Sequence, residues 1–343
     1  MRVIILVSFV ISIPLCAQPP AGYYDPAEGL TGEPLRIALR GIIENHSVLA
    51  YNSLWSAFGL TDRKPNNMVW DMYSDVPDGT APYEYAFVED QCGNYNSEGD
   101  CFNREHSFPQ SWFNSAPPMD TDLFHLYPTD AWVNQNRGNS AFGEVGVPTW
   151  TSENGSKVGS CAYPGCSGTV FEPIDAYKGD LARSYFYMLT RYYGVTGSWS
   201  SPMMQNGDFK PWVQSMLLQW HEDDPVSQKE IDRNNRIFIS LQFNRNPFID
   251  RPEWAYSIWG PTASVADRNN TSARMWMDDG VLHIQRTNAI GQGTIAVYSA
   301  QGELVRSGLV NADRMTMELD VAPGLYITML DLPEGRSTGR VLR

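Results

Sequence analysis

One stretch of the chain, residues 104–144, gathers the residue types that hydrolytic chemistry uses. It contains His106 and His125, two of the five histidines of the 343-residue chain. Its other candidate side chains carry carboxylate, amide or guanidinium groups: Glu105, Asp120, Asp122, Asp130, Asn134, Arg137, Asn139 and Glu144. Oxygen donors favour a hard cation such as Mg²⁺, and an imidazole beside such an ion can act as a general base. The simpler alternative for His106 is a buried, hydrogen-bonded residue in a polar loop.

The first element that must position these groups is a strand that ends near His106. Adjacent residues of a strand point to opposite faces, so Glu105 and His106 would diverge along a regular strand. Pro109 interrupts regular strand pairing, which predicts that the strand stops just after His106. If the strand ends or bends there, both side chains can still line one cavity.

The second element is a short helix between Thr129 and Gly138. Thr129 is a good N-cap, Asp130 suits the first turn and Gly138 suits the position after the last turn. Asn134 lies in the middle of this helix, where asparagine is mildly unfavourable. A role of this side chain as an inward-facing amide ligand would explain why asparagine occurs at this position. Asp130 and Arg137 fall on the same helix face as Asn134.

Four motifs in this order resemble the bacterial endonuclease I family. They are R-E-H-x-F-P-Q-S-W-F from Arg104, D-L-x-H-L-Y-P-x-D from Asp122, V-N-x-x-R-x-N from Val133 and F-G-E-V from Phe142. The resemblance covers roughly residues 22–260. Members are secreted or periplasmic nucleases with a ββα-metal active site. The resemblance therefore implies a sequence-non-specific enzyme for DNA, with RNA as a second candidate substrate, that acts as a monomer.

The same resemblance implies roles for individual residues. His106 would be the general base, and Glu105 and Asn134 would hold one Mg²⁺ ion, for which Mn²⁺ or Ca²⁺ could substitute. Family members also place an arginine between the histidine motif and the D-x-x-H motif, to stabilise charge on the phosphate. Here residues 113–122 contain no arginine or lysine, so Arg104 and Arg137 become the candidates for that cation.

The chemistry of phosphodiester hydrolysis accounts for these residue types. A neutral imidazole with a pKa of about 6.5 can take a proton from water near neutral pH. One divalent ion can neutralise the scissile phosphate and the leaving oxygen. A structural zinc site would instead need four closely spaced Cys or His ligands, which this stretch lacks.

Composition and the first residues bear on location and binding. The formal net charge is −14, whereas nucleic-acid binders are usually basic. The acidity predicts weak non-specific affinity for nucleic acid and reliance on a divalent cation.

Residues 1–17 read as a secretory signal peptide, with Arg2 before an apolar run. We expect cleavage after Ala17; lipoprotein cleavage before Cys16 is the alternative. The remaining apolar runs are too short to span a membrane.

Four cysteines remain after Cys16, in two close pairs. Three connectivities are open to them. Loop closure favours the local pairs, Cys92 with Cys101 and Cys161 with Cys166. A zinc site is the rival, although neither pair has the C-x-x-C form.

Further expectations concern the rest of residues 18–260, the catalytic domain. Residues 68–90 alternate enough for two strands, and residues 145–170 read as loop. A long helix is expected within residues 171–194, with Arg183 and Arg191 on one side. This helix is either a packing helix or an electropositive wall for phosphates. His46 is predicted to be structural and His221 to be a surface or capping residue.

Composition changes at about residue 261. Residues 261–343 contain short alternating segments separated by turns, which predicts a small antiparallel β-sandwich. The tail resembles the C-terminal sorting domain of the type IX secretion system, which implies passage through the periplasm to the surface or medium. A carbohydrate-binding or structural β-module is the alternative.

These observations favour an α+β protein, with a mixed α/β catalytic domain followed by a β-sandwich tail. The function predicted is that of an exported, metal-dependent endonuclease. A metal-dependent extracellular phosphoesterase is one alternative, and cleavage of supercoiled plasmid would separate the two. A non-catalytic surface binding protein is another, against which the intact Glu105, His106 and Asn134 argue.

Overall fold

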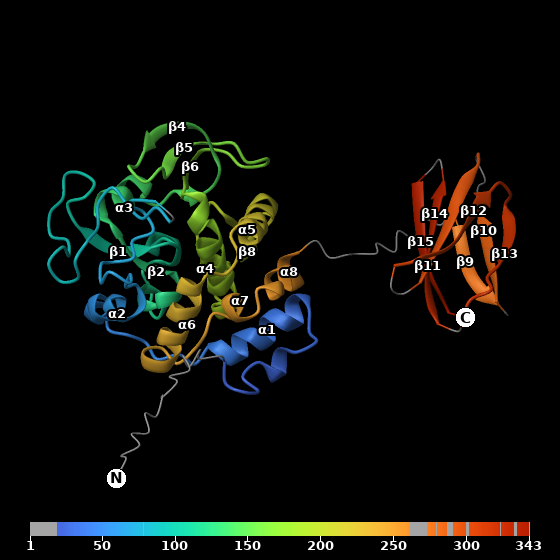
Figure 1. The fold of residues 1–343 in the computed structure, drawn as a ribbon, viewed down its shortest axis with the longest axis horizontal. Helices are drawn as coiled ribbons and strands as arrows, with labels where there is room; N and C mark the ends of the chain where they lie inside the picture. Colours follow the sequence, from blue (N-terminus) through green and yellow to red (C-terminus); the bar gives the residue numbers. More distant parts are fainter. Residues whose placement is uncertain are drawn as a thin grey trace, which may run out of the picture. The chain divides into compact units, whose positions relative to one another are not determined.

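The computed structural model describes residues 19–260 except 78, and residues 273–342 except 279, 287–290, 300–301, 323 and 333–334. The predicted signal peptide lies outside this part of the chain. The chain folds into two compact units, which divide after Gly260 (Figure 1). The first is a mixture of helices and small sheets and the second is all β, so the predicted α+β class is confirmed.

The first unit is built around α4 (Lys178–Arg191), which occupies its centre (Figure 1). Every residue of α4 from Lys178 to Thr190 is buried. Helices α1 (Gly32–Ile43), α5 (Pro211–Asp223) and α7 (Pro247–Asp250) contact it. Arg183 is fully buried and pairs with Glu230 on α6 (Gln228–Ser240). Helix α4 is therefore a packing helix and not an electropositive wall for phosphates.

The remaining helices of the first unit follow local signals in the sequence. Helix α2 (Leu54–Thr61) precedes the catalytic stretch, and α8 (Glu253–Trp259) closes the unit. Helix α5 ends at Asp223 and α6 begins at Gln228. Ser227 and Glu230 form a capping box that starts α6, which satisfies backbone N–H groups that a helix start leaves unpaired.

A strand–strand–helix unit carries the motif residues. Strand β1 (Phe102–His106) pairs antiparallel with β2 (Leu126–Asp130), and α3 (Ala131–Arg137) follows directly. The strand ends at His106 as predicted. The N-cap of α3 is Asp130 rather than Thr129, because Asp130 Oδ1 accepts the Val133 N–H at 2.7 Å while Thr129 stays in the strand ladder. Gly138 follows the helix with φ +55°.

The expectation of two strands in residues 68–90 is wrong. No strand runs through the described part of residues 68–90. There the Asp71 carboxylate accepts the backbone N–H groups of Tyr73 and Asp130, at 2.7 and 2.8 Å, so side-chain bonds replace a strand ladder.

Residues 145–170, expected as loop, instead contribute most of a four-stranded sheet. Its strands are β3 (Ala141–Phe142), β4 (Val145–Thr151), β5 (Lys157–Cys161) and β6 (Thr169–Glu172), in the order β3-β6-β5-β4. The ladders that join β4 to β5 and β5 to β6 compensate for the weak β-propensity of glycine. Short strands β7 (Met204–Gln205) and β8 (Asp208–Phe209) form a separate hairpin.

The second unit consists of two antiparallel sheets that share one apolar core. Strands β9 (Ala273–Asp278), β10 (Val281–Arg286) and β13 (Arg314–Glu318) form the first, in the order β13-β10-β9. Strands β11 (Gly293–Ser299), β12 (Leu304–Val310), β14 (Leu325–Leu332) and β15 (Gly335–Leu342) form the second, in the order β12-β11-β14-β15. No helix in the described ranges is long and apolar enough to cross a membrane.

Candidate active site

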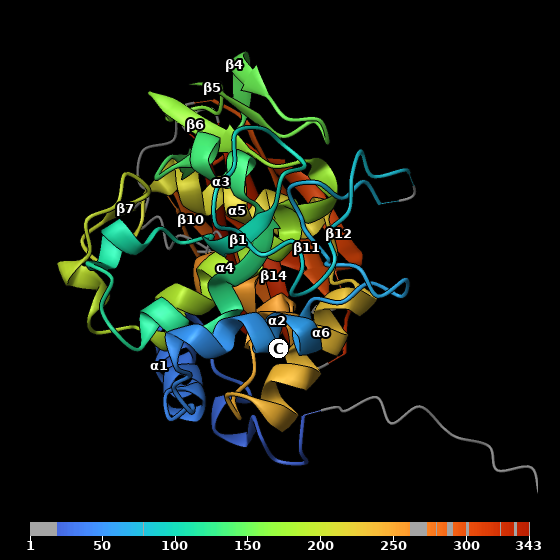
Figure 2. The same cartoon turned by 90° about the vertical axis from the view of Figure 1, so that its left-hand side faces the viewer.

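The alternation of β1 sorts the motif residues onto two faces. Arg104 and His106 lie on one face, and Asn103 and Glu105 lie on the other, toward α3. Figure 2 shows β1 near the middle of the first unit with α3 beside it. The candidate base and the candidate metal ligands therefore approach the end of β1 from opposite sides of the strand.

Glu105 is held in place by two donors. Its side chain is buried, and its Oε1 accepts the Tyr73 hydroxyl at 2.8 Å and the Arg137 guanidinium. Arg137 also donates to the carbonyl oxygens of His106 and Ser107. Only 1% of Arg137 is exposed, so this guanidinium orients the end of β1 and has no surface left for a substrate phosphate.

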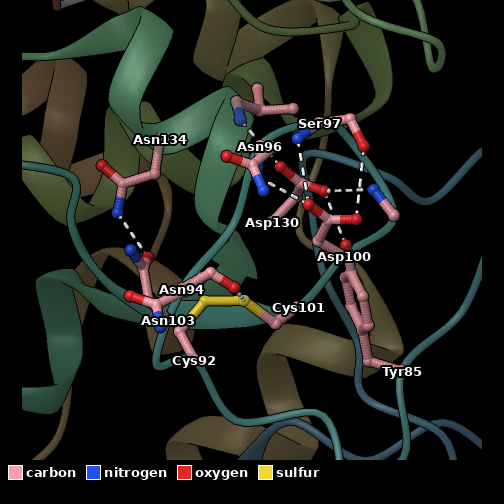
Figure 3. Close-up of a disulfide and its surroundings, with 12 residues drawn as sticks. Tyr85, Cys92, Asn94, Asn96, Ser97, Asp100, Cys101, Asn103, Asp130 and Asn134 are labelled. Carbon is pink, nitrogen blue, oxygen red and sulfur yellow. Dashed lines mark hydrogen bonds between the residues drawn. A yellow bond between two sulfur atoms is a disulfide. The ribbon is translucent and has the colours of Figure 1, made fainter.

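Asn134 is fixed by a second amide on β1. Its Nδ2 donates to Asn103 Oδ1 at 2.7 Å, as Figure 3 shows. This bond leaves Asn134 Oδ1 without a hydrogen-bond donor among the described residues, and the same holds for Glu105 Oε2. One carboxylate oxygen and one amide oxygen thus remain available at the junction of β1 and α3. This donor set suits Mg²⁺, which prefers oxygen ligands and keeps several waters.

His106 is largely buried, and a backbone carbonyl selects its tautomer. Its Nε2 lies 3.0 Å from the carbonyl oxygen of Asp120. A carbonyl only accepts, so Nε2 carries the proton and Nδ1 keeps a lone pair. The Gln110 atom that lies 3.0 Å from the same nitrogen is the amide nitrogen, a donor. Rotation of this amide by 180° would bring its oxygen there to accept the same proton, whereas the carbonyl has no such choice. Burial, reinforced by the nearby His125, lowers the pKa of His106 to about 3, so the imidazole is neutral at pH 7.

Tyr51 links His106 to Arg104 on the outer face of β1. The Tyr51 ring lies 6.3 Å from the His106 ring, with 12° between the planes. The Arg104 guanidinium lies 4.1 Å from the centre of the Tyr51 ring and 4.6 Å from that of Trp55. Two aromatic rings therefore hold one partly exposed cation on the face that carries His106.

Tyr51 and Tyr73 were not singled out from the sequence. Both precede the catalytic stretch by more than thirty residues in the chain, and neither belongs to a metal-ligand or acid–base pattern. Tyr73 lies within residues 68–90, where the alternation was interpreted as strands.

The other histidines of the first unit are structural. His125 is fully buried, and its Nε2 lies 2.6 Å from the Met119 carbonyl oxygen. His46 is buried and accepts a hydrogen bond from Arg191, as expected of a structural residue. The prediction that His221 lies at the surface is wrong, because this side chain is buried. It lies between Arg183 and the Pro252 carbonyl oxygen, and burial lowers its pKa to about 4.

A disulfide ties a loop to the start of α3. Cys92 pairs with Cys101 and Cys161 with Cys166, so both predicted bridges are confirmed and the zinc alternative is wrong. Inside the first loop, Gly99 N–H donates to Asp130 Oδ2 at 2.9 Å. The Ala131 N–H donates to the Cys101 carbonyl oxygen at 3.0 Å. The loop therefore helps to fix the helix that bears Asn134.

The junction of two strands and a helix thus brings together a neutral histidine, two oxygen atoms without hydrogen-bond donors among the described residues and the buried Arg137. A family model described as Endonuclease I matches residues 31–253, and the chain belongs to that family. It is therefore a nuclease, a hydrolase that acts on phosphodiester bonds.

Similar proteins agree with that assignment. The chain is 37% identical to an extracellular ribonuclease of Bacillus subtilis (strain 168) over 69% of its own length and 78% of the relative. It is 36% identical to the extracellular ribonuclease of Bacillus amyloliquefaciens over the same shares. An Endonuclease-1 of Buchnera aphidicola subsp. Baizongia pistaciae (strain Bp) is 26% identical over 38% of this chain and 46% of that protein. The extracellular relatives and the two disulfides indicate a secreted protein.

Proposed function

We propose that the chain is a secreted, Mg²⁺-dependent, sequence-non-specific endonuclease that cleaves DNA and RNA. The observation that carries the proposal is the hydrogen bond from His106 Nε2–H to the Asp120 carbonyl oxygen, at 3.0 Å. It leaves the lone pair of Nδ1 on a neutral imidazole, and such a nitrogen can accept a proton.

In the proposed reaction, His106 takes a proton from a water molecule as that water attacks the phosphorus atom. A bond forms between phosphorus and the water oxygen, and the bond to the 3′-oxygen of the strand breaks. The 3′-oxygen leaves with the electron pair and takes a proton from solvent, and the protonated imidazole returns its proton to solvent. Arg104, held by Tyr51 and Trp55, supplies the positive charge that stabilises the extra negative charge on the phosphate. Arg137 acts as a positioning residue for Glu105.

Glu105 and Asn134 would hold the metal ion through Glu105 Oε2 and Asn134 Oδ1. The bound ion would neutralise charge on the scissile phosphate and the leaving oxygen. Mg²⁺ fits a sparse oxygen site, and Mn²⁺ or Ca²⁺ could substitute for it. The net charge of −14 adds weight to this role, because a chain so acidic attracts polyanions poorly without a cation.

Two relatives named extracellular ribonuclease support RNA as a substrate, and the relatives named Endonuclease-1 support an endonucleolytic cut. The test is incubation of the mature protein with supercoiled plasmid, single-stranded DNA and RNA, each with Mg²⁺ and with excess chelator. We expect all three to be cut only with the metal. Full activity in chelator, or hydrolysis of small phosphate esters in place of plasmid, would contradict the proposal and favour a phosphoesterase.

For the rest of the chain, we propose that residues 1–17 direct export and that residues 261–343 are the sorting domain of the type IX secretion machinery. The small all-β unit that follows Gly260 supports a separable tail. A chain truncated after Gly260 should cut DNA within a few-fold of the full chain but accumulate in the periplasm of the native host. Normal export of the truncated chain would refute the sorting role. Light scattering of the mature protein should give the mass of a monomer.

A further inference from the structure

The second compact unit has a hollow on the outer face of its three-stranded sheet. Along β10, Leu282 and Ile284 are buried in the core, whereas His283 and Gln285 are only half-buried. Residues alternate between the two faces of a strand, so His283 and Gln285 face outward. A cavity of about 380 Å³ lies there, and its lining includes Trp276, His283, Gln285, Arg314 and Thr316.

Strand register arranges these side chains in two rows. His283 lies opposite Trp276 on β9 and opposite Thr316 on β13. Gln285 lies opposite Arg314 in the next outward row. Side chains paired directly across strands are close enough to bind one ligand together. The hollow therefore combines an aromatic row with a row of hydrogen-bonding groups.

The aromatic row presents flat rings at the surface. The rings of Trp276 and His283 lie 5.1 Å apart with 7° between their planes. Trp276 is 37% exposed, whereas its neighbours Met275 and Met277 pack against the core of the sandwich. Trp276 is therefore an outward ring in a hollow and does not fill the core.

We infer that this hollow is a saccharide-binding site for neutral polysaccharides built of hexopyranose units. One face of such a sugar ring is lined by C–H groups that pack on an aromatic ring, and its hydroxyls need donors and acceptors at the rim. Trp276 offers the ring, and Gln285 and Thr316 both donate and accept. A mostly concave site with a few convergent polar groups is the usual form of a small-ligand pocket.

The charge around the hollow favours a neutral polymer over nucleic acid. Asp278 and Glu318 are exposed on the same face, both opposite Val281. These two carboxylates outnumber Arg314, the one described arginine that lines the hollow, so a phosphate backbone is not attracted there, whereas the carboxylates can accept hydrogen bonds from sugar hydroxyls. The site would hold the protein on a polysaccharide layer, and it does not depend on the nuclease chemistry of the first unit.

Native affinity electrophoresis of the full chain tests this site. Separate gels contain xyloglucan, galactomannan, mixed-linkage β-glucan or heparin. We expect at least one of the three neutral polysaccharides to retard the wild type and Trp276→Ala to weaken that binding at least tenfold. Gln285→Ala should weaken it several-fold. Ile327→Ala is the matched control, because Ile327 on β14 has the same 37% exposure on the other sheet. Plasmid cleavage by all three variants should equal that of the wild type.

Three results would overturn the inference. One is equal mobility of the wild type with and without each neutral polysaccharide. Another is retardation by heparin alone, which would indicate a polyanion site. The third is unchanged retardation of Trp276→Ala and Gln285→Ala. Thermal unfolding compared with Ile327→Ala shows whether Trp276→Ala still folds; if it does not, Gln285→Ala, which changes only a half-buried surface amide, decides the outcome.

Discussion

Arg137 and Glu105 form a buried ion pair where α3 meets β1. The guanidinium donates to Glu105 Oε1 and to the carbonyl oxygens of His106 and Ser107. One arginine thus fixes the candidate metal ligand and the backbone of the candidate base together. Removal of one partner of a buried ion pair leaves the other charge unpaired, which is far more costly than the loss of a surface charge.

The two candidate arginines should therefore respond differently to mutation. Arg137→Ala should lower the free energy of unfolding by about 3–5 kcal/mol. Arg104→Ala should change it by about 0.5 kcal/mol or less and lower kcat by about 10²–10³, because Arg104 is partly exposed and clamped beside His106. Urea denaturation and plasmid-cleavage kinetics measure the two effects. Normal stability of Arg137→Ala would contradict the positioning role.

The role of His106 can be separated from that of the neighbouring His125. His106→Ala should keep the fold and reduce kcat by about 10²–10⁴, the usual contribution of a general base. His125→Ala should instead lower the free energy of unfolding by about 1–3 kcal/mol, because it leaves the buried Met119 carbonyl without its donor. If His106→Ala cuts plasmid at nearly the wild-type rate, His106 is not the base.

Metal binding should depend on an asparagine that is itself no ligand. Asn103 accepts the hydrogen bond that orients Asn134, so Asn103→Ala should raise the Mg²⁺ concentration for half-maximal activity by about 10- to 100-fold. Saturating Mg²⁺ should restore most of kcat. Asn136→Ala is the matched control, since its amide donates to the Trp132 carbonyl oxygen on the same helix. Equal effects of both variants would show that Asn103 does not act through Asn134.

The two disulfides should differ in their effect on activity. The double variant Cys92→Ser with Cys101→Ser frees the loop that is hydrogen-bonded to the start of α3. The Mg²⁺ concentration for half-maximal activity should therefore rise, and kcat should fall. The matched variant Cys161→Ser with Cys166→Ser should lose stability, typically about 2–4 kcal/mol for a native bridge, and keep the Mg²⁺ requirement. Equal Mg²⁺ titrations of both double variants would show that the first bridge does not support α3.

Stability should fall on acidification because of buried histidines. Burial and the charge of Arg183 lower the pKa of His221 to about 4, against about 6.5 in the unfolded chain. The unfolded state therefore binds the proton first, so this contribution is complete above pH 6.5 and is lost as pH falls through 4. The free energy of unfolding should fall by up to about 3 kcal/mol as a result. Burial also lowers the pKa values of His46 and His125, which adds to it.

His221→Gln keeps a donor for the Pro252 carbonyl and removes the titrating ring. Its free energy of unfolding, measured by urea denaturation between pH 4 and pH 7, should fall less steeply with acid than that of the wild type. Parallel curves for the two proteins would show that His221 does not titrate in this range.

The sequence by itself determined the elements whose signals are local. Pro109 predicted the end of β1, Gly138 the end of α3, and short loops the two disulfides, because each depends on residues close together in the chain. It also determined the membership of the first unit in a nuclease family, through motifs whose order is specific. Alternation of apolar and polar residues in the tail predicted its antiparallel strands.

Tertiary structure decided which neighbours each side chain meets. Arg104 and Arg137 were equivalent candidates in the sequence, yet one lies at the surface under Tyr51 and the other is buried against Glu105. His221 looked exposed beside acidic residues but packs under Arg183. Such contacts join residues tens of positions apart, and the burial that sets charge, tautomer and pKa arises only when those distant segments pack together.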